Sequence, residues 1–196
     1  AEAVPFIAHP QIRHRGTIGG TLAHADPAAE LPAVALALGA RLRLQSDREE
    51  RWVDSQDFFL GLLTTALAPE EVLVEIDIPA PLPGTGWSFV EVSRRHGDYA
   101  LAGLAATMTL DESGSCTAAR LVYLSAGDGP LNASLAAGQL VGSKPEDRLI
   151  EEVARRAAEE EVQPTGDIHA SAEFKRHLCR VLTHEALHTA ARRARP

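Results

Sequence analysis

The chain has 196 residues, of which 45% are hydrophobic, 23% charged and 5% aromatic, and its formal net charge is -8. This composition excludes a disordered chain and predicts an aliphatic core in one large or two small domains. The acidic balance disfavours a free-standing nucleic-acid binder, which would normally be basic.

The two cysteines, Cys116 and Cys179, form neither a CxxC pair nor a metal-ligand spacing. We therefore expect no iron–sulfur cluster or structural zinc on this chain's own thiols, while a single disulfide stays open. The longest apolar run, residues 31–40, is too short to span a bilayer. With no signal peptide visible we expect a cytoplasmic protein, and the first residue, Ala1, suggests a processed or truncated start.

The N-terminal third has weak periodicity. Residues 1–25 predict a loop with short extended pieces. Asp26-Pro27 is a helix-start signal, with an N-cap acceptor followed by proline. Pro32 predicts either a kink in this helix or the start of a second one, which ends at Gly39.

The next segments alternate between strand and helix patterns. Residues 41–46 and 71–79 alternate apolar and polar side chains as strands do, and a turn at 47–48 leads to a third strand at 51–53. Residues 57–66 predict a short apolar helix. Three prolines and a glycine within residues 79–84 predict a rigid connector, so we expect domains at 1–84 and 85–196.

The second half predicts an antiparallel meander followed by helices. The expected strands are 87–93, 100–110 and 117–125, and the expected helices are 131–141, 146–160 and 171–193. Strands first and helices after them indicate an α+β fold. The acidic run at 159–161 is expected to be a solvated helix end.

The run Thr17-Ile18-Gly19-Gly20-Thr21 is the most unusual local sequence. Adjacent glycines permit positive φ and close approach of another group, and successive N–H groups can form an anion-binding nest. A tight turn with no ligand explains the same residues. The run matches neither the GxGxxG fingerprint nor a Walker loop.

The flanks of this run carry a family resemblance. Residues 9–32, 69–73, 94–100 and 174–178 resemble the medium subunits of carbon monoxide dehydrogenase, xanthine dehydrogenase and related molybdenum hydroxylases. The resemblance implies part of a PCMH-type FAD-binding domain, followed by a C-terminal α+β domain with a three-stranded antiparallel sheet and helices. It also implies an electron-transfer subunit with no catalytic residue and no metal ligand of its own.

The resemblance further implies which residues contact FAD. These are Thr17, Ile18, Gly19, Gly20 and Thr21 at the diphosphate and ribityl group, Ala23 and His24 along the ribityl group and flavin, Glu30 as a carboxylate near the cofactor, Leu73 at the adenine end, and Tyr99 over one face of the isoalloxazine. A side chain at Gly20 is expected to abolish FAD retention. The alternative for residues 94–99 is a charged strand end and turn.

Members of this family begin with a further subdomain carrying a second Gly-rich loop of the AGGxS kind, which this sequence lacks. We therefore expect either a fragment whose other half is a separate polypeptide, or a chain that cannot hold FAD tightly alone. The implied partners are a large molybdenum–pterin subunit and a small [2Fe-2S] subunit, with NAD⁺, a quinone or dioxygen as the electron acceptor. No nucleic acid and no membrane span are expected.

Two other functions stay open. His184-Glu185-Ala186-Leu187-His188 matches the HExxH pattern of zinc peptidases, in which two histidines share a helix face and the glutamate acts as a base. No third ligand follows in the sequence, so a packing helix is the favoured interpretation. The second alternative is a flavin-free assembly module that retains the fold without the cofactor.

Overall fold

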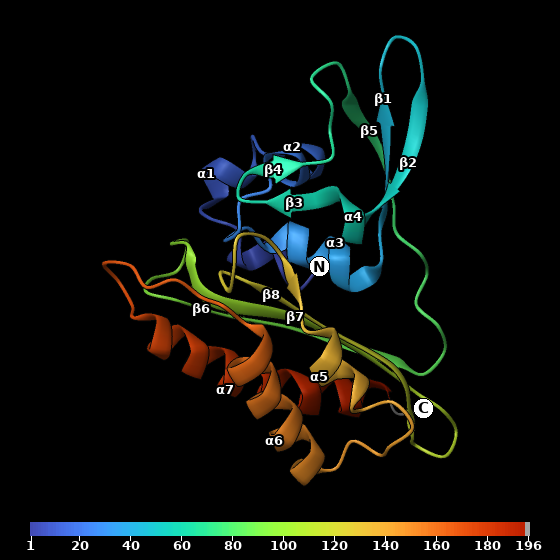
Figure 1. Cartoon of the computed structure of the whole chain (residues 1–196), viewed down its shortest axis with the longest axis vertical. Coiled ribbons are helices and arrows are strands. Elements are labelled where there is room, and N and C mark those ends of the chain that lie inside the picture. The colour runs from blue at the N-terminus through green and yellow to red at the C-terminus, as the bar shows by residue number, and fades with distance from the viewer. Residues whose placement is uncertain (195–196) are drawn as a thin grey trace.

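The computed structural model describes residues 1–194 and contains a long antiparallel sheet with helices on both faces (Figure 1). Its strands are β6 (Thr85–Ser93), β7 (Ala100–Leu110), β8 (Cys116–Leu124) and the short β9 (Leu131–Asn132), in the order β6-β7-β8-β9. The predicted three-stranded meander is confirmed, and β9 adds a short fourth strand that the sequence pattern did not indicate.

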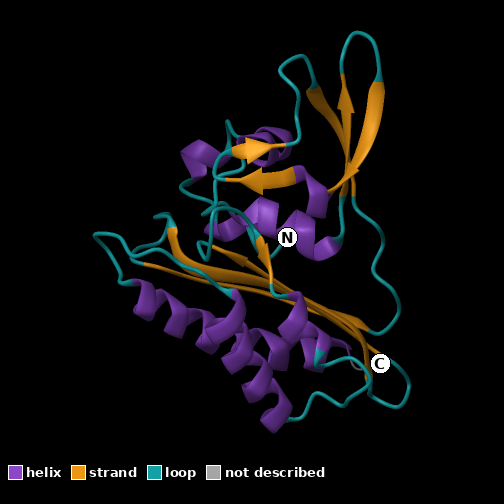
Figure 2. Ribbon diagram, viewed as in Figure 1, coloured by secondary structure: helices purple, strands orange, loops and turns teal. Residues whose placement is uncertain are grey.

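The helices of the C-terminal half cover one face of this sheet (Figure 2). They are α5 (Ser134–Gly138), α6 (Asp147–Arg156), a π-helical turn (Ala157–Glu161) and α7 (Ala172–Ala194). Their apolar side chains form the largest core cluster with the facing side chains of β7 and β8, including Leu104, Met108, Leu121, Tyr123, Leu182 and Leu187. Cys116 and Cys179 are buried free thiols, so no disulfide joins them.

The acidic run at 159–161 does more than end a helix. The Glu161 carboxylate accepts the backbone N–H groups of Leu135 at 3.0 Å and Ala136 at 2.7 Å. These N–H groups belong to the first turn of α5, where they have no acceptor within the helix. The expectation of a purely solvated helix end is therefore wrong for Glu161, which caps a neighbouring helix.

Helix α3 (Glu30–Leu38) covers the opposite face of the sheet (Figure 1). Its small apolar side chains pack against β7 and β8 in a second cluster made of Ala33, Leu36, Ala37, Ala100, Ala105, Val122 and Leu124. Arg120 of β8 donates to the carbonyls of Leu36 at 3.2 Å and Ala37 at 3.4 Å. A cation at a helix C-terminus stabilises the helix dipole, so Arg120 fixes the end of α3 to the sheet.

The start of α3 differs from the sequence prediction. Asp26 is not its N-cap: the Asp26 Oδ1 accepts the N–H of Ala28 at 2.9 Å and forms a turn, and α3 begins at Glu30. Pro32 lies in the first turn, where its missing N–H costs no helical hydrogen bond. The predicted end at Gly39 is confirmed, with a φ of 65°.

The prediction of a loop with short extended pieces for residues 1–25 is wrong. This segment contains a 3₁₀ helix (Val4–Phe6), α1 (Pro10–Arg13) and α2 (Ile18–His24). Each is shorter than the span over which a helical hydrophobic period can be recognised, and two of them have proline near their first residue.

A second, three-stranded sheet completes the N-terminal half, in the order β2-β1-β5. Its strands β1 (Arg41–Gln45), β2 (Glu50–Asp54) and β5 (Val72–Asp77) confirm the alternating segments. The helix predicted for 57–66 is wrong: α4 spans only Ser55–Phe58, and a hairpin of β3 (Phe59–Gly61) and β4 (Thr64–Thr65) follows. Three leucines of this segment, Leu60, Leu62 and Leu63, are exposed. They therefore do not form the buried apolar face that the predicted helix would have had.

Gly86 allows α7 to lie directly on β6. A Cβ at this position would lie 2.0 Å from the carbonyl oxygen of Ala190. We predict that Gly86→Ala lowers the free energy of unfolding by about 3 kcal/mol, because the α7 backbone must shift. Chemical denaturation measures this. Gly138→Ala, where a Cβ meets nothing within 4 Å, is the matched control and should change stability little; equal effects of the two would contradict the proposed contact.

Candidate functional site

The Gly-rich run forms the first turn of α2. Thr17 is the N-cap, and its Oγ1 accepts the N–H of Gly20 at 3.0 Å. Thr21 Oγ1 donates to the Thr17 carbonyl at 3.1 Å. Gly19 and Gly20 are helical rather than left-handed, so the run is a helix N-terminus and not a positive-φ nest. First-turn N–H groups such as those of Ile18 and Gly19 have no acceptor within a helix, and they carry the positive end of its dipole.

The two glycines have different surroundings. A Cβ on Gly20 would lie 2.9 Å from Thr17 Oγ1, so glycine at this position accommodates the helix cap. A Cβ on Gly19 would have Leu73 Cδ2 of β5 as its nearest neighbour, at 4.0 Å, so the fold itself does not require glycine there. Helical glycine costs roughly 1 kcal/mol relative to alanine. Gly19 is therefore explained better by close approach of another molecule than by packing.

The structure brings most of the predicted contact residues together on α2 and β5. Leu22 is buried and anchors α2 on the core beneath β1. Ala23 is half-buried, while Ile18 and His24 are exposed. Leu73 is partly buried beside Gly19. One exposed surface therefore contains the N-terminal turn of α2 and its outward side chains.

Glu30 lies in the first turn of α3 and is buried. A second carboxylate, Glu91 of β6, was not predicted as a site residue. Its Oε2 is buried and has no hydrogen-bond partner within residues 1–194. Burial, together with a smaller contribution from the charge of Glu30, raises the pKa of Glu91 to about 8. Burial likewise raises the pKa of Glu30, with a smaller contribution from Asp26.

A buried carboxylate with an unsatisfied oxygen is costly unless it is protonated or accepts a hydrogen bond from another molecule. The sequence signal for Glu91 was available: it interrupts the apolar run of β6, and it shares the strand face of Phe89, which packs toward α3. Its partner Glu30 comes from a distant helix, which is why sequence spacing alone did not reveal the pair.

Tyr99 lies on the loop between β6 and β7, and its side chain is 76% exposed. This loop is held at two points. Gly97, with a φ of 90°, lies so close to the imidazole of His9 that a Cβ would be 2.3 Å from it, and Arg94 Nη1 is 2.7 Å from His169 Nδ1. The loop thus extends between the segment before α1 and the segment before α7, with Tyr99 free to contact another molecule.

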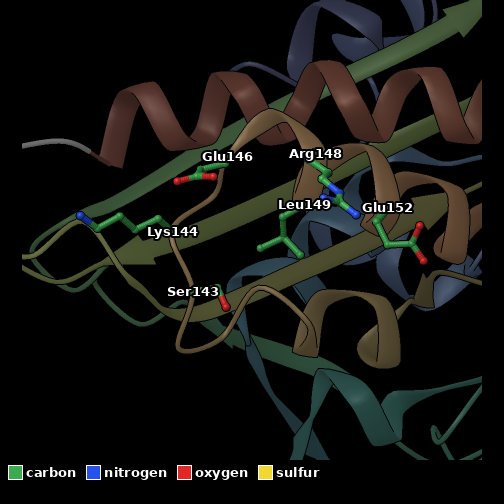
Figure 3. Close-up of a pocket in the computed structure, with 6 residues that line it drawn as sticks. All are labelled: Ser143, Lys144, Glu146, Arg148, Leu149 and Glu152. Carbon is green, nitrogen blue, oxygen red and sulfur yellow. The ribbon is translucent and has the colours of Figure 1, made fainter.

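A separate hollow lies at the start of α6 (Figure 3). It has a volume of about 550 Å³ and is lined by Ser143, Lys144, Glu146, Arg148, Leu149 and Glu152. Arg148, Leu149 and Glu152 extend from α6, while Ser143 lies below them in this view and the Lys144 side chain extends to the left (Figure 3). It contains none of the predicted cofactor residues, so it is not part of the surface around α2.

The HExxH pattern lies on α7, where Glu185 is exposed. Across residues 1–194, no three or more His, Cys, Asp or Glu side chains are arranged as a ready metal site. This arrangement does not support a zinc peptidase. None of the described helices has the length and apolar character needed to cross a bilayer.

The buried Glu91 generates a pH-dependent stability prediction. Because its pKa in the fold is about 8 against an ordinary value of 4.5, the folded state binds more protons between these values. Its contribution to stability is therefore present below pH 4.5 and is lost as pH rises toward 8 and beyond. Glu91→Gln should remove this loss and raise the free energy of unfolding at pH 8.5 by about 1–2 kcal/mol, a value reduced for partial solvent screening.

Denaturation at pH 6 and pH 8.5 tests this prediction. Glu112→Gln, in an exposed turn, is the control and should leave the pH dependence unchanged. If the wild type and Glu91→Gln lose stability in parallel between the two pH values, Glu91 does not carry the effect.

Known proteins are similar to this chain over both of its halves. Residues 1–81 match the family described as FAD binding domain in molybdopterin dehydrogenase, and residues 87–190 match the CO dehydrogenase flavoprotein C-terminal domain. The chain is 41% identical over 196 residues to 6-hydroxypseudooxynicotine dehydrogenase complex subunit alpha of Paenarthrobacter nicotinovorans, covering 100% of this chain and 66% of that protein.

Other similar proteins also belong to dehydrogenases and oxidoreductases. The carbon monoxide dehydrogenase medium chain of Hydrogenophaga pseudoflava is 34% identical over 97% of this chain and 66% of its own length. The solved structure of carbon monoxide dehydrogenase from that organism superposes with a TM-score of 0.94 at 35% identity, over 98% of this chain and 67% of the solved one. Quinoline 2-oxidoreductase from Pseudomonas putida 86 gives a TM-score of 0.90 at 36% identity, over 98% of this chain and 66% of the solved one.

The chain thus spans about two thirds of the length of the curated relatives that it matches. Each half matches its own domain model, and the fold superposes over nearly the whole chain on a carbon monoxide dehydrogenase chain. The chain belongs to the family of FAD-binding medium subunits of molybdenum hydroxylases.

Proposed function

We propose that this chain provides one side of an FAD site in a molybdenum hydroxylase complex and acts as its electron-transfer subunit. The observation that carries the proposal is the first turn of α2, where Gly19 leaves open space beside Leu73 although the fold does not need glycine there. Bound FAD would accept electrons one or two at a time and release them to an external acceptor.

The residues of this chain would supply binding and orientation. The helix N-terminus at Thr17–Thr21 offers backbone N–H donors and a positive dipole end, which suit a diphosphate. Ala23, His24 and Leu73 extend the same surface, consistent with the ribityl and adenine contacts that the family resemblance implies. Tyr99 is exposed enough to cover a planar ring.

The proposal also explains the buried carboxylates Glu30 and Glu91, which offer hydrogen-bond acceptors to a bound cofactor. A ribityl chain carries hydroxyl donors, and the buried Glu91 Oε2 has none within the described chain. A ribityl hydroxyl that donates a hydrogen bond to Glu91 Oε2 would remove the cost of this unsatisfied buried oxygen. Because the pKa of Glu91 is raised, the carboxyl pair would also hold a proton close to the cofactor.

The partners and the domain division belong to this proposal as well. We propose a large molybdenum–pterin subunit and a small [2Fe-2S] subunit as partners, since relatives are named as a medium chain and as a subunit of a dehydrogenase complex. A further N-terminal FAD-binding segment with an AGGxS-type loop would complete the cradle. The chain would divide into 1–84, which carries the FAD surface, and 85–196, which includes the long sheet.

The first test is flavin content. The polypeptide containing this chain, co-expressed with the subunits encoded beside it, should show the visible absorption bands of oxidised flavin, which dithionite bleaches. A colourless intact complex would refute the FAD assignment and favour the flavin-free assembly module. The coding sequence upstream of Ala1 shows whether an AGGxS-type segment precedes it.

The second test separates ligand contact from folding. Gly19→Ala should reduce FAD retention by at least about tenfold, because the added methyl group faces the open space of the cradle, while the unfolding temperature stays the same or rises. Gly138→Ala is the matched control in another helix and should retain FAD. Gly20→Val is less informative, because its Cβ contacts Thr17 Oγ1 and disturbs the helix cap. Full flavin occupancy in Gly19→Ala would exclude this turn as the diphosphate contact.

A further inference from the structure

The two histidines of the HExxH pattern on α7 lie close enough together to bind one metal ion, whether or not the helix belongs to a peptidase. His184 and His188 lie one turn apart on α7, with their Nε2 atoms 3.3 Å apart and their ring centroids 4.5 Å apart. Two imidazoles on one tetrahedral Zn²⁺, each about 2.0–2.1 Å from the metal, have nitrogens about 3.3 Å apart. The two Nε2 atoms therefore have the spacing of two ligands of one metal ion.

A third donor comes from the neighbouring helix rather than from the sequence after His188. Asp147, the first residue of α6, has its Oδ1 3.8 Å from His188 Nε2. Its side chain is 94% exposed, so it can rotate toward the pair without breaking a packed contact. As they stand, the three side chains are not a closed ligand set; binding would draw the Asp147 carboxylate toward the two histidines.

The local charges suit a cation better than the basic composition of α7 suggests. Arg180, one turn before His184, is paired with Glu151 of α6. Its charge is therefore compensated by a carboxylate that is itself close enough to His184 for the two to interact. Asp147 adds a second negative charge to the same face of α6.

We propose that His184, His188 and Asp147 bind one divalent transition-metal ion of the zinc class, with water in the remaining position, and that this ion joins α6 to α7. Two imidazoles and one carboxylate are a ligand set that Zn²⁺ accepts in proteins. Glu185 is exposed and is not one of the three ligands, and we assign the metal a structural role without peptidase activity. The proposal is independent of the FAD surface.

Zinc titration of the whole chain, carrying no histidine tag and first treated with a chelator, tests the site. Calorimetry should show one saturable zinc site per chain, and saturating zinc should raise the unfolding temperature because the metal binds only the folded arrangement. His184→Ala and His188→Ala should each weaken binding at least about tenfold. Asp147→Asn should weaken it by a smaller factor.

His177→Ala is the control, because this histidine is exposed on the same helix and outside the pair. Its affinity for zinc should equal that of the wild type. Absence of saturable binding by the wild type, or binding that survives in the double variant His184→Ala/His188→Ala, would overturn the site. Unchanged affinity in Asp147→Asn would overturn the three-ligand arrangement. Unfolding temperatures without zinc confirm that each variant is folded.

Discussion

The attachment of α3 to the long sheet is the constraint on which the rest of the structure depends. β7 and the second half of β8 are buried on both faces, by α5 and α7 on one side and by α3 on the other. The contact with α3 uses small side chains, so the helix lies close to the strands. Arg120 then binds the last carbonyls of α3, and Gly39 turns the chain away at a φ that glycine adopts freely. Thus α3 is fixed by packing along its length and by charge at its end.

This attachment positions the candidate site. Because α3 is fixed on the sheet, its first turn brings Glu30 toward Glu91 on β6. Leu22 packs into the core shared by α3 and β1, so the N-terminal turn of α2 takes a defined position beside β5. The proposed FAD surface therefore depends on contacts made well away from it, and its polar residues are oriented by apolar packing.

The sequence predicted the elements whose hydrophobic period extends over enough residues. The strands β1, β5, β6, β7 and β8 were of this kind, and the long helix α7 was also predicted. The short helices α1 and α2 lacked such a period, although Thr17 was a recognisable N-cap residue. The run 57–66 was misassigned because a short apolar stretch fits a helix or a strand equally well, and only tertiary packing decides between them.

The candidate site was predictable only where its residues are contiguous. The run from Thr17 to Thr21 and its flanks could be recognised, but its helical conformation could not. Glu91 was missed because its significance depends on Glu30, and Asp147 was missed because it approaches His188 from another helix. Residue pairs that form between distant segments have no characteristic spacing in the sequence, so the structure is needed to find them.

The position of α3 also bears on how the chain unfolds. Two family models divide the chain, yet α3 lies within the first of them while its apolar face belongs to a core cluster with strands of the second. Separating the two halves would expose that cluster and break the Arg120 contacts. The two halves are therefore expected to lose structure together, as one cooperative unit, and the proposed FAD surface would not open independently of the sheet that supports it.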